Sequence, residues 1–331
     1  MKNITILVPE TAIMEAVADP RYVFTAANDM LLSAGKKPIF QVQLVGLKKS
    51  VKLMNGLATI HPDKTIDEVT KTDLIIIPAL SGDLNVALEL NKKFIPWIVT
   101  QHAKGAEVAS LCIGSFLLAS TGLIDGKKCS SHWLTADIFR EMFPQVELVD
   151  GSILSEENGV YSSGGANSYW TLLLYLLEKY TSRETAILAS KFFAVDIDRD
   201  SQNKFMMFKG QRNHADEAVK AAQDYIEKNI DEKITIDELA DKVAMGRRSF
   251  ERRFKQATNN SVLEYIQRVK IEAAKRSLET SRKNVNEVMV DVGYSDTKAF
   301  RDLFKKITGL TPIEYRNKYN KLSLDPAGRL V

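Results

Sequence analysis

The chain has 331 residues, of which 45% are hydrophobic and 26% are charged, values of an ordinary globular protein that exclude disorder and a collagen-like or coiled-coil architecture. The length predicts two domains, no apolar run reaches the ~20 residues that cross a bilayer, and the N-terminal apolar stretch is too short for a signal peptide. These properties predict a two-domain cytoplasmic protein without a membrane partner.

Charge and cysteine content give two further expectations. The net charge of +3 is unevenly placed, because residues 211–331 hold 24 basic and 19 acidic side chains whereas residues 1–210 hold 21 and 23. A basic C-terminal third indicates that a polyanion, if the protein binds one, meets this part of the chain. Cys112 and Cys129 are too few for a disulfide framework and are expected as free thiols.

The N-terminal part of the chain alternates short apolar segments with helical patterns. Strands are predicted at residues 4–8, 40–45, 73–78 and 107–112, and helices at residues 22–32, 85–99 and 114–119. Continuous apolar strands separated by helices are typical of βαβ units, so we expect an open α/β sheet with helices on both faces.

A polar stretch over residues 198–204 interrupts this pattern and predicts a domain boundary. Only helical patterns follow, at residues 216–229, 236–243, 247–257, 262–280, 286–292, 296–308 and 312–319. We therefore expect an α/β domain over residues 1–200, a linker over 201–215, an all-α domain over 216–321 and a loose tail over 322–331.

The all-α domain contains an internal repeat. Residues 238–245 match residues 287–294 at an offset of 49, and Phe250 and Phe254 have counterparts 50 residues further on. Each copy predicts a short helix, a tight turn and a second helix with inward-facing aromatics at i and i+4, which is a helix-turn-helix unit. Thr235 is expected to cap the first short helix and Ser295 the second helix of the second unit.

The outward face of each second helix is polar and rich in Lys and Arg. Such a helix can enter the major groove, where Arg can donate two hydrogen bonds to guanine and phosphates attract nearby cations. A single basic helix is more often a solvated surface. Two tandem units with matched spacing favour DNA binding.

Residues 216–319 resemble the DNA-binding domain of the AraC/XylS family of transcription regulators. The motifs that carry the resemblance lie at residues 234–240, 265–270, 292–296 and 304–316. The resemblance implies two helix-turn-helix units joined by the helix over 262–280, with double-stranded DNA as partner. The residues expected to contact DNA are Arg247, Arg248, Arg252, Thr297, Lys298, Arg301 and Asp302.

Cys112 ends an apolar strand, and a predicted helix that opens with Gly114 follows it directly. The unpaired N–H groups and the positive dipole end of such a helix lower the pKa of a neighbouring thiol, as in a nucleophile elbow. His132 lies just beyond the next predicted strand, and Glu15 lies in the first strand-to-helix region. These three residues are the candidate catalytic set if the domain is an enzyme.

Residues 112–133, with residues 143–144 and 161–166, resemble the DJ-1/PfpI group of class I glutamine amidotransferase-like domains, over roughly residues 3–195. The similarity is greatest to the branch fused to AraC-type domains. It implies a flavodoxin-like sandwich, small-molecule sensing without catalysis, and an amino acid or a quaternary amine as effector. Glu15 falls one position from the acid of the enzymatic relatives, where Ala16 stands here.

Ligands of an open α/β sheet bind at the carboxyl ends of its strands, where we expect Cys112, His132 and Glu15. Trp133, Tyr169 and Trp170 are aromatics that can approach the same place and suit a cation, although aromatics at such spacing are more often core residues. Neither a phosphate loop nor metal-ligand spacing occurs in the sequence, so no cofactor or metal is expected.

These features predict a homodimeric, sequence-specific transcription regulator whose N-terminal domain senses a small metabolite and is not an enzyme. The alternatives are a DJ-1/PfpI-type cysteine hydrolase or glyoxalase-like enzyme, and a regulator in which Cys112 is a redox sensor.

Overall fold

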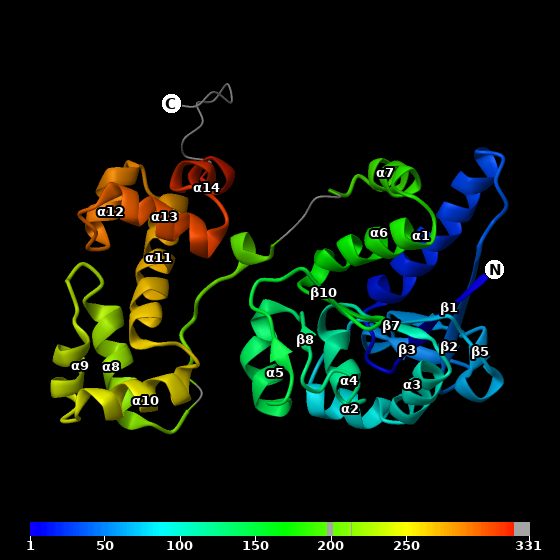
Figure 1. Ribbon diagram of the computed structural model, residues 1–331, viewed down its shortest axis with the longest axis horizontal. Coiled ribbons are helices and arrows are strands. Elements are labelled where there is room, and N and C mark those ends of the chain that lie inside the picture. The colour runs from blue at the N-terminus through cyan, green and yellow to red at the C-terminus, as the bar shows by residue number, and fades with distance from the viewer. Residues whose placement is uncertain (197–200, 213, 321–331) are drawn as a thin grey trace. The chain divides into compact units, whose positions relative to one another are not determined.

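The computed structural model describes residues 1–196, 201–212 and 214–320, and it divides into two compact units, Met1–Gln202 and Asn203–Val331 (Figure 1). Asp198, Arg199 and Asp200 of the expected boundary, and the expected tail over 322–331, lie outside the described residues. Among the helices that the structure describes, none is long and apolar enough to cross a membrane.

The first unit is built on a seven-stranded sheet with the order β10-β11-β7-β6-β1-β2-β5. All neighbouring strands are parallel except β10, which runs antiparallel to β11. The strands are β1 (Lys2–Val8), β2 (Phe40–Gly46), β5 (Lys64–Thr65), β6 (Leu74–Ile77), β7 (Glu107–Ser110), β10 (Leu154–Glu157) and β11 (Val160–Ser163). The order β2-β1-β6-β7-β11 is that of flavodoxin-like folds, which confirms the predicted α/β sandwich.

Helices cover both faces of this sheet (Figure 1). One face carries α1 (Met14–Ser33), α6 (Tyr169–Tyr180) and α7 (Arg183–Phe192), and the other carries α2 (Leu84–Asn91), α3 (Phe94–Ala103), α4 (Ser115–Ala119) and α5 (Ala136–Met142). Both faces of the sheet are apolar, because successive side chains of a strand point to opposite faces. In β1, Ile4 and Ile6 are buried under α1 and α6, whereas Leu7 is buried in the opposite layer.

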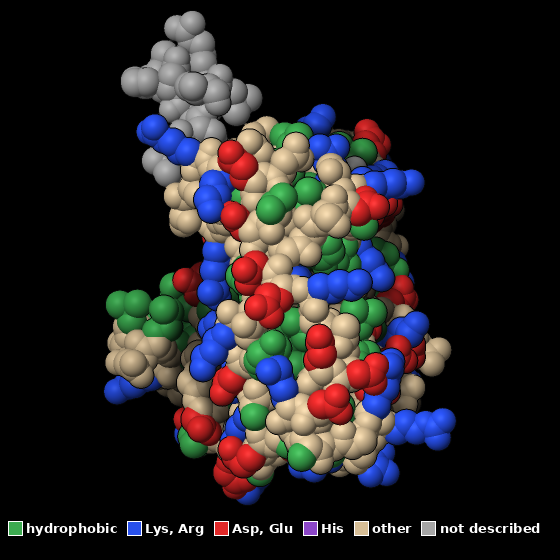
Figure 2. Space-filling model, turned by 90° about the vertical axis from the view of Figure 1, so that its left-hand side faces the viewer, with side chains coloured by type: hydrophobic (Ala, Val, Ile, Leu, Met, Phe, Trp, Pro, Cys, Tyr) green, Lys and Arg blue, Asp and Glu red, His purple; other side chains and the backbone are tan. Residues whose placement is uncertain are grey.

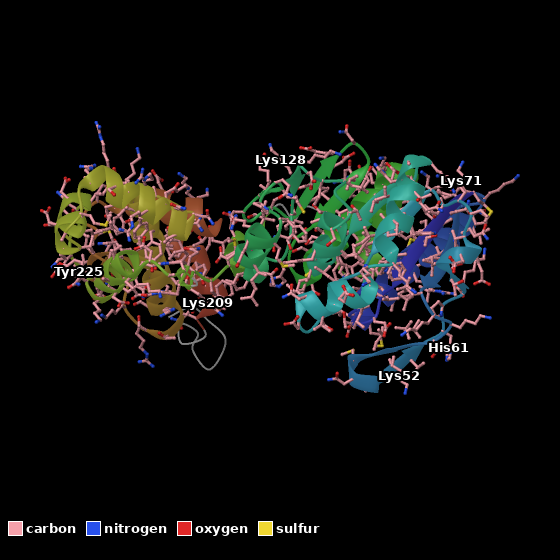
Figure 3. The ribbon with its side chains drawn as sticks, turned by 90° about the horizontal axis from the view of Figure 1, so that it is seen from below. Lys52, His61, Lys71, Lys128, Lys209 and Tyr225 are labelled. Atoms are coloured by element: carbon pink, nitrogen blue, oxygen red, sulfur yellow. The ribbon has the colours of Figure 1, made fainter. Side chains whose placement is uncertain are left out.

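Two short strand pairs complete the first unit. The hairpin of β3 (Val51–Leu53) and β4 (Ala58–Ile60) projects from the body of the domain, where Figure 3 shows Lys52 and His61. The second pair, β8 (Lys128–Cys129) and β9 (Glu147–Leu148), is parallel.

Two helices differ from the prediction. The helix expected over residues 22–32 begins at Met14 and contains the buried Pro20. The segment expected as one helix over residues 85–99 forms two helices, α2 and α3, which are separated by a turn at Lys92 and Lys93. Pro96 then lies in the first turn of α3, where its missing N–H breaks no helical hydrogen bond.

The second unit is all-α, and the helix-turn-helix pattern is confirmed. Its helices are α8 (Glu217–Lys228), α9 (Ile236–Lys242), α10 (Arg247–Thr258), α11 (Val262–Thr280), α12 (Val285–Asp291), α13 (Thr297–Thr308) and α14 (Pro312–Tyr319). The paired aromatics are fully buried, Phe250 and Phe254 in one core and Phe300 and Phe304 in another. Because α11 contributes its first half to one core and its second half to the other, it is the shared spine of both units.

Of the two predicted helix caps, the one on α9 is present and the one on α13 is not. Thr235 and Glu238 form the expected capping box on α9. Ser295 does not cap α13, because the helix begins one residue later than expected and Asp296 accepts the N–H groups of Lys298 and Ala299 at 2.8 and 2.9 Å.

Candidate functional sites

The second helices of the two units present exposed polar side chains. On α10, Arg247, Arg248 and Arg252 are exposed. On α13, Lys298, Arg301 and Asp302 are exposed and Thr297 is half-buried. On the face of the second unit that Figure 2 shows, Lys and Arg side chains alternate with Asp and Glu side chains. This face is therefore of mixed charge rather than uniformly basic.

Of the four arginines of α10, two form ion pairs within the described residues and two do not. Arg247 pairs with Asp237 at 2.9 Å. Arg253 forms a two-pronged pair with Asp216, at 2.7 Å for each nitrogen, and thereby ties α10 to the start of α8. These hydrogen bonds from Arg253 lower the pKa of the Asp216 carboxyl. Within the described residues Arg248 and Arg252 make no ion pair, so both guanidinium groups are available to a ligand.

Lys270 joins the two helix-turn-helix units, a role that the sequence did not reveal. It is buried in α11, and its Nζ donates to the carbonyl oxygens of Glu232 at 2.8 Å and Val292 at 3.1 Å. Burial lowers the pKa of this ammonium group. Gly293 lies against it with a φ of +71°, and a Cβ there would lie 2.4 Å from the Asp231 carbonyl oxygen. Because Lys270 bonds to backbone carbonyl groups, the only sign of these contacts in the sequence is the glycine at position 293.

The first unit places Cys112 on a sharp turn between β7 and α4, with a φ of 54° in the left-handed region. A Cβ on Gly114 would lie 2.6 Å from the carbonyl oxygen of Pro78, so the turn packs tightly against the end of β6. The Cys112 N–H donates to Ser163 Oγ at 3.3 Å, and this hydroxyl donates to the Ser110 carbonyl at 3.3 Å. Backbone contacts thus fix the cysteine at the carboxyl end of the sheet.

The expected lowering of the Cys112 pKa is wrong. The side chain is 2% exposed and packs in an apolar cluster with Ala12 and Ala16. Burial raises the pKa of the Cys112 thiol to about 12, because lost hydration outweighs the hydrogen bond from the Ile113 N–H. Burial likewise raises the pKa of Cys129 to about 12.

His132 and Glu15 make no catalytic link to Cys112. His132 Nδ1 accepts a backbone N–H two residues on at 3.0 Å, its ring lies 5.6 Å from that of Trp133, and burial lowers its pKa. Glu15 is exposed on α1. Within the described part of the chain, no hydrogen bond or ion pair joins Cys112 to either residue, and the buried Ala16 provides no acid.

A Tyr–Asp pair lies near Cys112, and only its aromatic member is expected from the sequence. Tyr169 of α6 donates its hydroxyl to Asp19 of α1 at 2.6 Å. Burial, this hydrogen bond and the negative charges of Asp19 and Glu15 raise the pKa of Tyr169. Trp170 lies beside it with ring centroids 6.4 Å apart. Two acids four residues apart on α1, one helical turn, were the available signal.

The raised thiol pKa gives a direct chemical prediction. At pH 8 a thiol with a pKa near 12 holds roughly a thousandfold less thiolate than free cysteine, and burial slows access further. N-ethylmaleimide should therefore label Cys112 of the native chain at least about a hundredfold more slowly than free cysteine, as measured by mass spectrometry of its peptide. Labelling as fast as that of free cysteine would support the redox-sensor alternative.

The α/β sandwich and the paired helix-turn-helix units define a transcription regulator with a sensor domain and a DNA-binding domain. Residues 3–179 match the DJ-1/PfpI family, and residues 239–318 match a helix-turn-helix domain family. The chain belongs to the DJ-1/PfpI family, and its C-terminal unit is a DNA-binding domain of the AraC type.

Two transcriptional regulators of Pseudomonas aeruginosa are similar to this chain. The chain is 25% identical to the HTH-type transcriptional regulator GbdR over 78% of this chain and 69% of that protein, and 28% identical to the HTH-type transcriptional regulator ArgR over 65% of each. A crystal structure of a transcriptional regulator protein from Vibrio parahaemolyticus covers 58% of this chain and 98% of that one, with a TM-score of 0.52 and 21% identity. This likeness supports the fold.

Proposed function

We propose that this protein is a homodimeric cytoplasmic regulator that reads DNA with α10 and α13 and responds to a small amino acid or quaternary amine. The observation that carries the DNA-reading part is the duplicated unit, in which two helices with exposed cations are fixed to one spine, α11. Arg248 and Arg252 are the proposed base readers of the first unit. In the second unit the proposed contacts are Thr297, Lys298, Arg301 and Asp302, and Arg247 contributes after leaving Asp237.

The proposed effector site lies at the carboxyl ends of the strands, beside the Cys112 turn. Glu15 and Asp19 supply negative charge, and Tyr169 and Trp170 supply aromatic faces, a combination that attracts a cationic amine. His132 and Trp133 are proposed for the rim formed by the loop after β8.

We further propose that the site binds without catalysis. The support is chemical, because the raised pKa keeps the Cys112 thiol protonated and the Nδ1 of His132 accepts the backbone N–H of Leu134. A nucleophile of this kind needs a neighbouring base that hydrogen-bonds to it.

The experiment that tests DNA reading is a map of the genomic fragments that the full-length protein retains at near-physiological salt, where non-specific binding fades. Discrete sites whose half-sites are about one helical turn apart are expected from a dimer. Diffuse retention that disappears with added salt would contradict sequence-specific reading.

The effector class is tested by the thermal stability of the full chain with a panel of amino acids and quaternary amines. A ligand at 100 times its Kd adds about 2.7 kcal/mol to the free energy of unfolding. Asp19→Asn should weaken this gain for cationic ligands, whereas Asp29→Asn, an exposed acid further along α1, should not. Equal gains in both variants would place the ligand elsewhere.

A further inference from the structure

Gln202, the last residue of the first unit, has a polar side chain that is only 2% exposed. Its Oε1 accepts the N–H of Gly165 at 2.5 Å. Its Nε2 donates to the carbonyl oxygens of Ser152 at 2.6 Å and Ser131 at 3.2 Å. One donor thus faces the amide oxygen and two acceptors face the amide nitrogen, which is the pattern that recognises a primary carboxamide.

Two consecutive glycines shape the slot around this side chain. A Cβ on Gly164 would lie 1.8 Å from Gln202 Nε2, and a Cβ on Gly165 would lie 2.8 Å from Oε1. Any larger residue at these positions would expel the side chain. The backbone is held as well, because the Gln202 N–H donates to the Gly151 carbonyl at 2.8 Å.

The loops that hold Gln202 also border the Cys112 turn. Gly164 directly follows Ser163, whose hydroxyl accepts the Cys112 N–H. The hydroxyls of Ser131 and Ser115 share a hydrogen bond of 2.7 Å, and Ser115 is the first residue of α4, which follows the Cys112 turn. Ser131 also directly precedes His132. A shift of either loop at the proposed effector site therefore changes the geometry of the slot.

We propose that this slot is a carboxamide-binding site occupied by the chain's own Gln202, and that its occupation couples the Cys112 turn to the segment that leads to the DNA-binding unit. An effector that moves the 131 or 164–165 loop weakens the hold on Gln202, and by reciprocity the seated Gln202 alters effector affinity. This regulatory meaning rests on the proposed function. The existence and chemistry of the slot do not.

The slot is tested with full-length Gln202→Ala and acetamide, which replaces the atoms that the substitution removes. Acetamide at ~100 mM, a concentration suited to a ligand of four heavy atoms, should raise the melting temperature of Gln202→Ala and leave that of the unaltered chain unchanged. Acetate, of the same shape, should stabilise neither, because its charge faces the carbonyl oxygens of Ser131 and Ser152. Equal effects of acetamide on both proteins would overturn the proposal.

The coupling is tested by N-ethylmaleimide labelling of Cys112. Loss of the three hydrogen bonds should loosen both loops and raise the labelling rate of Gln202→Ala about tenfold, and acetamide should reverse this rise where acetate does not. Tryptic cleavage after Lys204, two residues beyond Gln202, should also rise, but acetamide should not reverse it, because a free amide fills the slot without tethering the chain.

A second variant covers the case in which Gln202→Ala fails to fold. Gln202→Glu keeps the shape and sets a carboxylate against two carbonyl oxygens, so it should raise both Cys112 labelling and cleavage. Unchanged labelling in the folded variants would overturn the coupling. None of these readouts requires DNA or effector, so they stand even if the protein binds DNA without sequence preference.

Discussion

Gly293→Ala should lower the free energy of unfolding of the C-terminal unit by about 3 kcal/mol or more. A φ of +71° costs alanine about 1–2 kcal/mol by itself. The new Cβ would also lie 2.4 Å from the Asp231 carbonyl oxygen and 2.7 Å from Lys270 Nζ. Relief of these contacts requires a backbone shift that separates Lys270 from its two carbonyl partners, so strain and lost hydrogen bonds add.

The measurement is urea unfolding of the full-length chain, with hydrogen exchange to localise the transition to α12–α14. Gly309→Ala is the matched control and should cost only the penalty of about 1–2 kcal/mol for the positive φ. Gly309 follows a helix with a φ of +76°, and nothing lies within 4 Å of a Cβ there. The repeat supplies a natural comparison, because Ala244 stands at the equivalent turn of the first unit with a φ of 52°. Similar losses at both glycines would show that crowding against Lys270 is unimportant.

Arg248→Ala should weaken binding to the preferred DNA site by about 1–3 kcal/mol and relax base preference at one position. The reason is that Arg248 is exposed on α10 and has no ion-pair partner in the described structure, so its two-pronged hydrogen bonding is free for a guanine edge. Competition binding over all single-base variants of a site from the genomic map measures this effect.

Two variants separate base reading from simple charge. Arg248→Lys keeps the charge but not the paired donors, so it should lose the base preference while retaining much of the salt-dependent affinity. Arg276→Ala removes an exposed cation of α11, outside α10 and α13, and should leave base preference unchanged. A uniform loss over all sequences in Arg248→Ala would make Arg248 a phosphate contact.

Features that depend on local pattern could be predicted from the sequence. Apolar strands predict the α/β sandwich, and the recurrence of Phe250 and Phe254 fifty residues further on predicts the two helix-turn-helix units, whose cores the structure confirms. The sequence does not fix the first residue of α13, because Ser295 and Asp296 are both good N-caps and only the backbone conformation decides between them.

Features that depend on burial could not be predicted. A cysteine at a helix start suggests an activated thiol, but the surrounding apolar cluster reverses the direction of the Cys112 pKa shift. Gln202 lies in a stretch whose polarity predicts only a domain boundary, yet its side chain bonds to Ser131, Ser152 and Gly165. Such long-range hydrogen bonds leave no periodicity in the sequence.

The long helix shared by both C-terminal cores has a consequence for promoter architecture. With 19 residues, α11 is about 28 Å long. It packs into one core along its first half and into the other along its second half, so neither α10 nor α13 can slide relative to the other. In the proposed function, α10 and α13 read two successive segments of one half-site. Each base pair inserted between these segments would rotate the second by about a tenth of a turn away from its helix. Within one half-site, natural operators should therefore vary in bases but hardly at all in length.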